Sequence, residues 1–172
     1  DIGSNVLFRN DPANPENPED PVRVFVDVTS GLLGTTESSQ SANWVDYDND
    51  GDLDLFIANR FENLMLRNDG EDFENSGLWL FTDISESSGL DSSANTQGSS
   101  WCDFDNDGDV DLYMVNYGSS NFMFRNDNGV FIEIASGIGL ADSGLGRGAV
   151  WGDYNNDGNF DLYLTNFGSE NR

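Results

Sequence analysis

The chain has 172 residues, of which 32 are acidic and seven are basic, and its formal net charge is −25. Such a charge repels nucleic acids and anionic lipid surfaces, so we expect no nucleic-acid partner and no membrane insertion. The sequence has no histidine or lysine, and Cys102 is its single cysteine, which leaves carboxylates as the abundant chemical group. The 12 phenylalanines, five tyrosines and four tryptophans supply enough apolar surface for a folded core.

The first recognisable element is a heptad that occurs three times, as NVLFRND (5–11), NLMLRND (63–69) and NFMFRND (121–127), at a spacing of 58 residues. A proline-rich loop (11–21) follows the first copy. A second shared segment comes next in each repeat, as VFVDVTSGLLG, LFTDISESSGL and VFIEIASGIGL. The polar stretches 35–43 and 85–100 are predicted to be surface loops.

The third shared element is an acidic motif, WVDYDNDGDLDLFIAN (44–59), WCDFDNDGDVDLYMVN (101–116) and WGDYNNDGNFDLYLTN (151–166). All of these pieces are short, rich in aromatic and branched residues, and roughly alternating, which is typical of β-strands. In LDLFIA the alternation predicts Leu53, Leu55 and Ile57 on one face. We therefore expect four short antiparallel strands per repeat: one before the motif, one after it, the heptad and the segment that follows the heptad.

This pattern predicts an all-β protein of three tandem four-stranded antiparallel blade-like repeats, of the β-propeller type. Since closed propellers have ~4–8 blades, three repeats form an incomplete ring or an open array. The repeats are placed at 1–62, 63–120 and 121–172, with acidic loops at 46–54, 103–111 and 153–161. The first repeat opens with a heptad strand and the last stops before one. Two alternatives stay open: a piece of a longer array, or termini that complement each other between molecules and form a ring or a filament.

The spacing within the acidic motif is typical of a calcium loop. Oxygen ligands at positions 1, 3, 5, 7 (through the carbonyl) and 9 converge on one point, and glycine at position 6 permits the sharp turn. Hard oxygen ligands favour calcium over magnesium, which prefers a stricter octahedron. Three Ca²⁺ sites are predicted, with ligands Asp46, Asp48, Asp50, Asp52 and Asp54; Asp103, Asp105, Asp107, Asp109 and Asp111; and Asp153, Asn155, Asp157, Asn159 and Asp161.

Other interpretations of the motif are less favoured. An EF-hand needs a glutamate at position 12, where this chain has Ile57, Met114 and Leu164. A solvated acidic turn without an ion does not explain three copies of one spacing. Paired carboxylates can hydrolyse glycosides, but an enzyme needs one site, whereas a stabilising element is used once per repeat. We therefore predict no catalytic residue.

The motif D-Φ-[DN]-N-D-G-[DN]-Φ-D-L in β-repeats resembles the FG-GAP/VCBS repeat family, which includes the calcium-binding blades of integrin α-subunits. The phrasing NxLFRN … DYDNDGDLDLYxxN is most similar to bacterial secreted FG-GAP/VCBS proteins of the ASPIC/UnbV-associated type. The resemblance spans nearly the whole chain and implies a calcium-binding β-hairpin loop at the fifteen positions given above. The third loop departs from the pattern at Asn155, so weaker binding is expected there.

Two further side-chain roles are predicted from recurrence. Trp44, Trp101 and Trp151 precede each motif and are expected to pack between repeats, while Trp79 has no equivalent and is expected to be exposed. Each heptad also carries an arginine that is expected to form salt bridges from repeat to repeat, namely Arg9, Arg67 and Arg125.

The leading functional hypothesis is a calcium-stabilised extracellular or cell-surface protein with a structural or adhesive role. Its partners would be copies of itself, joined head to tail through complementary terminal strands, or further repeats of a longer chain. Extracellular glycans or proteins are the other partners considered. The alternative is a carbohydrate-binding propeller module, suggested by the aromatic content. A polysaccharide-active enzyme is the least favoured, because the chain offers few candidate bases.

Overall fold

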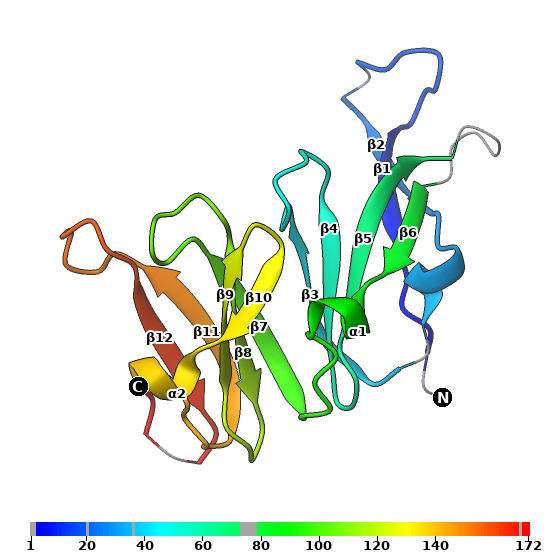
Figure 1. Ribbon diagram of the computed structural model, residues 1–172. Helices are drawn as coiled ribbons and strands as arrows, with labels where there is room; N and C mark the ends of the chain where they lie inside the picture. Colours follow the sequence, from blue (N-terminus) through cyan, green and yellow to red (C-terminus); the bar gives the residue numbers. More distant parts are fainter. Residues whose placement is uncertain (1–2, 20, 36, 73–78, 169) are drawn as a thin grey trace. The chain divides into compact units, whose positions relative to one another are not determined.

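The computed structural model describes residues 3–19, 21–35, 37–72, 79–168 and 170–172 (Figure 1). They divide into two compact units, Asp1–Glu37 and Ser38–Arg172. All sheets are antiparallel, and the helices of the described chain are short turns of four residues. No helix among these residues has the length and apolar character needed to cross a membrane.

The first unit is built on a two-stranded hairpin of β1 (Phe8–Pro12) and β2 (Arg23–Asp27), followed by the 3₁₀ turn η1 (Gly31–Gly34). Phe8 lies opposite Asp27, and Pro12 lies opposite Arg23. The proline-rich loop therefore connects the two strands of this hairpin.

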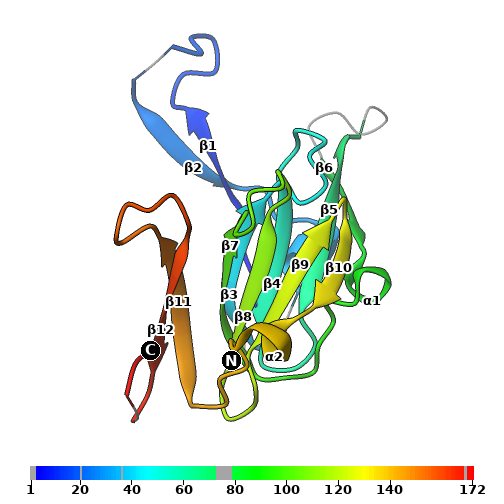
Figure 2. The ribbon, with the colours of Figure 1, turned by 60° about the vertical axis from the view of Figure 1, so that its left-hand side comes forward.

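The second unit contains two four-stranded sheets and a terminal hairpin, each a continuous meander (Figures 1 and 2). In each four-stranded sheet the order is the tryptophan strand, the acidic-motif strand, the heptad strand and the strand after the heptad, so the predicted fold class is confirmed. The first sheet consists of β3 (Ser39–Val45), β4 (Asp54–Asn59), β5 (Leu64–Glu71) and β6 (Trp79–Asp83), and the short helix α1 (Ser85–Ser88) follows it. The second sheet consists of β7 (Thr96–Cys102), β8 (Asp111–Asn116), β9 (Phe122–Asp127) and β10 (Val130–Glu133), and the short helix α2 (Ala135–Ile138) follows it. The terminal hairpin consists of β11 (Gly146–Gly152) and β12 (Asp161–Asn166).

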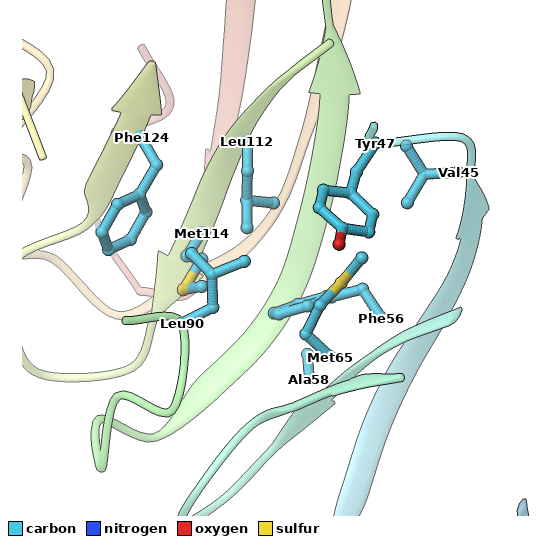
Figure 3. Packing of buried hydrophobic residues seen from close by; sticks show 9 residues of the cluster. All are labelled: Val45, Tyr47, Phe56, Ala58, Met65, Leu90, Leu112, Met114 and Phe124. Atoms are coloured by element: carbon cyan, nitrogen blue, oxygen red, sulfur yellow. The ribbon is translucent and has the colours of Figure 1, made fainter. Parts of the chain in front are cut away.

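The main core lies between the two four-stranded sheets. Phe56 and Ala58 of β4 belong to it, whereas their neighbours Leu55 and Ile57 do not, in line with the alternation of the strand. Every residue of β4 and of β8 is buried. Figure 3 shows the members, which are Val45, Tyr47, Phe56, Ala58, Met65, Leu90, Leu112, Met114 and Phe124. Burying one such side chain contributes about 1.5–3 kcal/mol, so this interface fixes one sheet against the next.

Two of the three recurring tryptophans join successive sheets. Trp101 of β7 contacts Phe56 of the preceding sheet, with ring centroids 5.8 Å apart and an edge-to-face geometry. Trp151 of β11 meets Tyr113 of β8 in the same way, at 6.4 Å. Trp44 differs, because it contacts Phe81 of its own sheet and is 47% exposed. Trp79 is 49% exposed, as predicted.

The polar stretches 35–43 and 85–100 are not wholly loops, so that prediction was wrong. The first includes the start of β3, and the second includes α1 and the start of β7. β7 lies beside both β3 and β11, and these strands approach closely. A Cβ atom on Gly98 would lie 3.2 Å from the carbonyl oxygen of Arg147. Gly98 therefore permits this close approach, although the composition of the stretch is typical of a loop.

The closest of these strand approaches is at Gly146, and it leads to a prediction about stability. A Cβ atom on Gly146 would lie 2.5 Å from Val115 Cγ1 and 2.7 Å from the carbonyl oxygen of Asn116. Gly146→Ala is therefore expected to lower the free energy of unfolding by about 1–3 kcal/mol, measured by denaturant unfolding. Gly152→Ala is the matched control, because a Cβ atom there meets nothing within 4 Å in the described structure. Equal stability of the two variants would contradict this account of the packing.

Candidate metal centre

Each acidic motif forms the turn of a β-hairpin, between β3 and β4, β7 and β8, and β11 and β12. Two residues of every turn adopt a left-handed backbone. They are the asparagine at position 4, with φ of 59°, 61° and 60°, and the glycine at position 6, with φ of 95°, 99° and 89°. Asparagine and glycine are the residues that tolerate this region best. The recurring Asn-Asp-Gly thus sets the shape of the loop, a role of the asparagine that the ligand pattern alone did not reveal.

The carboxylate at position 1 is held by the backbone of its own loop. Asp103 Oδ1 accepts a hydrogen bond from the N–H of Asp107 (3.0 Å), and its Oδ2 accepts one from the N–H of Gly108 (3.0 Å). The other loops repeat the second of these bonds, with Asp46 accepting from Gly51 (3.1 Å) and Asp153 accepting from Gly158 (2.9 Å). The first ligand is therefore oriented by backbone donors.

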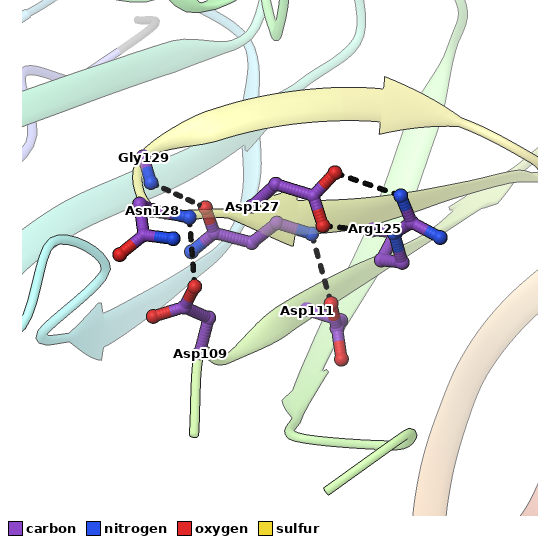
Figure 4. A network of polar contacts seen from close by, with 7 residues as sticks. Asp109, Asp111, Arg125, Asp127, Asn128 and Gly129 are labelled. Carbon is purple, nitrogen blue, oxygen red and sulfur yellow. Dashed lines mark hydrogen bonds and ion pairs between the residues drawn. The ribbon is translucent and has the colours of Figure 1, made fainter. Parts of the chain in front are cut away.

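The carboxylate at position 9 is held by the heptad strand. Asp54 Oδ1 accepts from the backbone N–H of Asn68 in β5 (2.8 Å), and its Oδ2 accepts from that of Tyr47 (3.3 Å). Asp111 repeats this with Asn126 of β9 (2.8 Å) and Phe104 (2.9 Å), as Figure 4 shows for the bond from β9. The heptad and the acidic motif recur together because one strand fixes a carboxylate of the other.

The structure gathers carboxylates in two of the three loops. One oxygen each from Asp46, Asp48 and Asp50 lie within 4.8 Å of one another, and so do oxygens of Asp103, Asp105 and Asp111. In the described part of the third loop no such carboxylate trio forms. There Asn155 Nδ2 donates a hydrogen bond to Asp157 Oδ2 (3.0 Å), so these two side chains bind each other.

Position 7 is tied to position 5 through its backbone N–H, while its predicted role as a carbonyl ligand stays a prediction. The N–H of this residue donates to the carboxylate at position 5 in every loop, at 2.9 Å, in the pairs Asp52–Asp50, Asp109–Asp107 and Asn159–Asp157. The Asp109 side chain is engaged elsewhere: its carboxylate accepts from Asn49 Nδ2 (2.7 Å) and from the N–H of Asn128 (2.7 Å), the second of which is drawn in Figure 4. Both carboxylate oxygens of Asp109 thus have hydrogen-bond partners outside its own loop.

Buried oxygens in the first loop provide a test of whether the residues fit a cation. Asp46 Oδ1 and Asp48 Oδ1 are both buried and have no hydrogen-bond partner among the described residues. A buried polar atom without a partner costs about 1–3 kcal/mol, and more when it is charged. An ion coordinated by both oxygens would satisfy them. The donor set consists of carboxylate oxygens from closely spaced residues and fits calcium.

Burial in the first two loops favours the protonated form of three aspartates. Burial, with a smaller effect of nearby aspartates, raises the pKa of Asp54 to about 6 despite the two backbone hydrogen bonds. The pKa of Asp111 is raised to about 6 for the same reasons. Burial and then the charges of Asp107 and Asp103 raise the pKa of Asp105. These three carboxyl groups of the first two loops therefore take up protons more readily than free aspartates do.

The predicted salt bridges between repeats do not form, so that prediction was wrong. Each heptad arginine pairs within its own strand with the aspartate two residues later, at 2.7 Å, as Arg9–Asp11, Arg67–Asp69 and Arg125–Asp127. Residues i and i+2 of a strand lie on the same face, which places the two groups within reach. These pairs are exposed and contribute little to stability.

Sequence reasoning also missed a pair of asparagines that close each hairpin at the other end and that are buried in the two four-stranded sheets. The side-chain oxygen of the first heptad residue accepts from the backbone N–H of the last motif residue. The pairs are Asn63–Asn59 (2.9 Å), Asn121–Asn116 (2.7 Å) and Asn171–Asn166 (2.8 Å). Both asparagines recur in the printed sequence, and this recurrence was the available signal.

A contact between neighbouring loops provides a second prediction. Asn49 Nδ2 of the first loop donates to Asp109 Oδ1 of the second (2.7 Å). Asn49→Gly removes this bond but keeps the left-handed backbone accessible, and should lower the free energy of unfolding by about 1 kcal/mol. Asn106→Gly, at the same position of the second loop with φ 61°, is the control. The measurement is denaturant unfolding of both variants, and an equal loss in both would contradict a role for the contact.

Comparison with known families gives one match. Residues 103–164 match the model of the FG-GAP-like repeat. The matched segment begins at the first predicted ligand of the second loop and ends within β12, so it includes the second and third loops and the heptad between them. No curated protein matches the chain.

Proposed function

Since this chain carries an FG-GAP-like repeat, we propose that it is a calcium-stabilised structural or adhesive module that acts outside the cell. FG-GAP repeats are generally structural or adhesive, typically extracellular, and commonly bind calcium. The observation that carries the proposal is the first carboxylate trio, with its two buried oxygens that lack a partner. Extracellular calcium would keep even weak loops occupied.

In this proposal calcium stabilises the protein by offsetting the repulsion between the carboxylates of a loop. Two unit charges 4 Å apart repel by about 4 kcal/mol at an effective dielectric near 20. A divalent ion turns this repulsion into attraction and couples the hairpin turn to the heptad strand through the position-9 carboxylate. The ligands would be the fifteen residues predicted from the sequence. The third loop would bind most weakly, because asparagine stands at two of its five ligand positions and it lacks a carboxylate trio among the described residues.

The main test is thermal melting with calcium and with a chelator. Two occupied sites should raise the melting temperature by about 10 °C at neutral pH. Asp48→Asn should abolish most of the gain from the first loop, yet it should not lower the melting temperature of the metal-free protein, because it removes repulsion. Asp91→Asn, on the surface outside the loops, is the charge-matched control. An identical melting temperature with and without chelator would refute the proposal.

The stabilisation measured in the same melting experiment should depend on pH in a defined direction. Asp54 and Asp111 have raised pKa values of about 6. Their protonation therefore stabilises the metal-free folded state below the unfolded pKa of about 4, and this stabilisation is lost as the pH rises through about 6. The stabilising effect of calcium should accordingly be smaller at about pH 5 than at about pH 7.5. A larger effect at the lower pH would contradict the assignment of these two ligands.

We further propose that β12 pairs with the β1 strand of a second copy. Phe56 and Tyr113, the central apolar residues of β4 and β8, are 0% and 1% exposed, whereas the equivalent Tyr163 of β12 is 53% exposed. Val150 on the neighbouring strand is 60% exposed. The terminal hairpin thus presents the same face that is covered in the other two sheets.

The pairing has a defined register. In the first sheet Leu55 lies opposite Leu66, and in the second Leu112 lies opposite Phe124. The equivalent pair across two copies is Leu162 with Phe8, the fourth residue of the first heptad. Phe8 is 58% exposed, and the β1–β2 hairpin would supply the two strands that complete a four-stranded sheet with β11 and β12. Strand addition of this kind joins molecules through backbone hydrogen bonds.

Sedimentation and negative-stain microscopy test the pairing. The chain is expected to associate with increasing concentration into rings or filaments, and Tyr163→Lys should weaken this by about tenfold or more by burying an unpaired charge. Val130→Lys on β10, also an exposed apolar site at 62%, is the matched control. A chain that is monomeric at all concentrations would contradict self-association and leave further repeats of a longer chain as the partner.

A further inference from the structure

The second unit contains a polar recess at the end of the inner strands that lies away from the acidic loops. Its volume is about 240 Å³, and its lining residues are Gln40, Arg60, Asn95, Gln97, Tyr117 and Arg147. Gln40, Gln97 and Arg147 are the second residues of β3, β7 and β11, while the acidic loops follow the last residues of these strands. A seven-residue strand is about 20 Å long, so the recess is separate from the proposed calcium sites.

The recess is unusual in its charge. Four of the arginines, Arg9, Arg67, Arg125 and Arg172, form ion pairs with aspartates. Arg60 and Arg147 form none among the described residues, although the chain has 32 acidic side chains. Both line this recess. Two guanidinium groups without a carboxylate partner are thus placed together in a protein with a net charge of −25.

Arg147 is held in place by its surroundings. Its Nη1 donates to Gln97 Oε1 (2.9 Å), and Gln97 Nε2 in turn donates to Asn95 Oδ1 (2.7 Å). The guanidinium also lies over the rings of Tyr117 (4.9 Å) and Phe167 (5.2 Å). A guanidinium has five N–H donors, so most remain for a ligand after the bond to Gln97. The group is preorganised, which reduces the ordering cost of binding.

We propose that this recess binds a small ligand that carries a carboxylate and hydroxyl groups, and that a single uronic acid residue is the best match. The two arginines fit a carboxylate, with which guanidinium groups form charge-assisted bonds. The amides of Gln40 and Asn95 can bond hydroxyls, and the volume suits one monosaccharide rather than a larger molecule. The site goes beyond the proposed structural role and includes no residue of the three acidic loops.

The test is calorimetric titration of the calcium-loaded protein with galacturonate. Galactose, which has the hydroxyl groups without the carboxylate, and acetate, which has the carboxylate without the hydroxyl groups, are titrated for comparison. Galacturonate should bind, and both galactose and acetate should bind about tenfold more weakly or not at all. Arg147→Gln and Arg60→Gln should each weaken galacturonate binding by about tenfold. Arg23→Gln, an exposed arginine of the first unit, removes the same charge and should leave binding unchanged.

Several results would overturn the proposal. These are no binding of galacturonate, equal binding of galactose or acetate, or equal binding by the Arg147→Gln and Arg23→Gln variants. Binding that survives both arginine substitutions but is lost with chelator would place the ligand on a calcium ion instead. An unchanged melting temperature of Arg147→Gln with calcium shows that its fold is intact, and Arg60→Gln tests the charge at a second residue, whose guanidinium lies over the neighbouring Phe61 ring.

Discussion

The convergence of like-charged carboxylates in the first two acidic hairpin turns is the constraint on which the other features of this protein depend. Backbone N–H groups hold these carboxylates in place: those of the loop hold position 1, and that of the heptad strand holds position 9. With both ends fixed, the side chains cannot move apart to relieve their repulsion. The raised pKa values of Asp54 and Asp111 have a different main cause, which is the burial of their carboxyl groups, and the charges of nearby aspartates add a smaller effect.

The link between turn and heptad also explains the order of segments along the chain. A four-stranded sheet combines the tryptophan and acidic strands with the heptad strand that follows them, so its two central strands are tied at both ends. At one end the heptad backbone bonds the position-9 aspartate, and at the other a heptad asparagine bonds the last motif residue. The loops consequently differ through their neighbours as well as their sequences. Asp54 and Asp111 are fully buried beside a heptad strand, whereas Asp161 on β12 is only partly buried.

The arginines of the protein differ in whether they have a carboxylate partner. The heptad arginines are neutralised by aspartates two residues away, so they add little to the field at the surface. Arg60 and Arg147 lie at the opposite end of the inner strands from the acidic loops and are not neutralised in this way. One end of the second unit therefore carries the acidic loops, and the other presents two arginines among amide side chains.

The sequence by itself determined the strands, their antiparallel order within a sheet and the loop geometry, because these depend on residues close together in the chain. Alternation marks strands, and Asn-Asp-Gly marks a left-handed turn. Only the tertiary structure decided which carboxylates converge, where Trp44 and the heptad arginines point, and that Thr96 and Gly98 lie in a buried strand. Those outcomes depend on how closely neighbouring strands approach. Small polar residues are equally compatible with an exposed loop and a crowded inner strand until the adjacent sheet is in place.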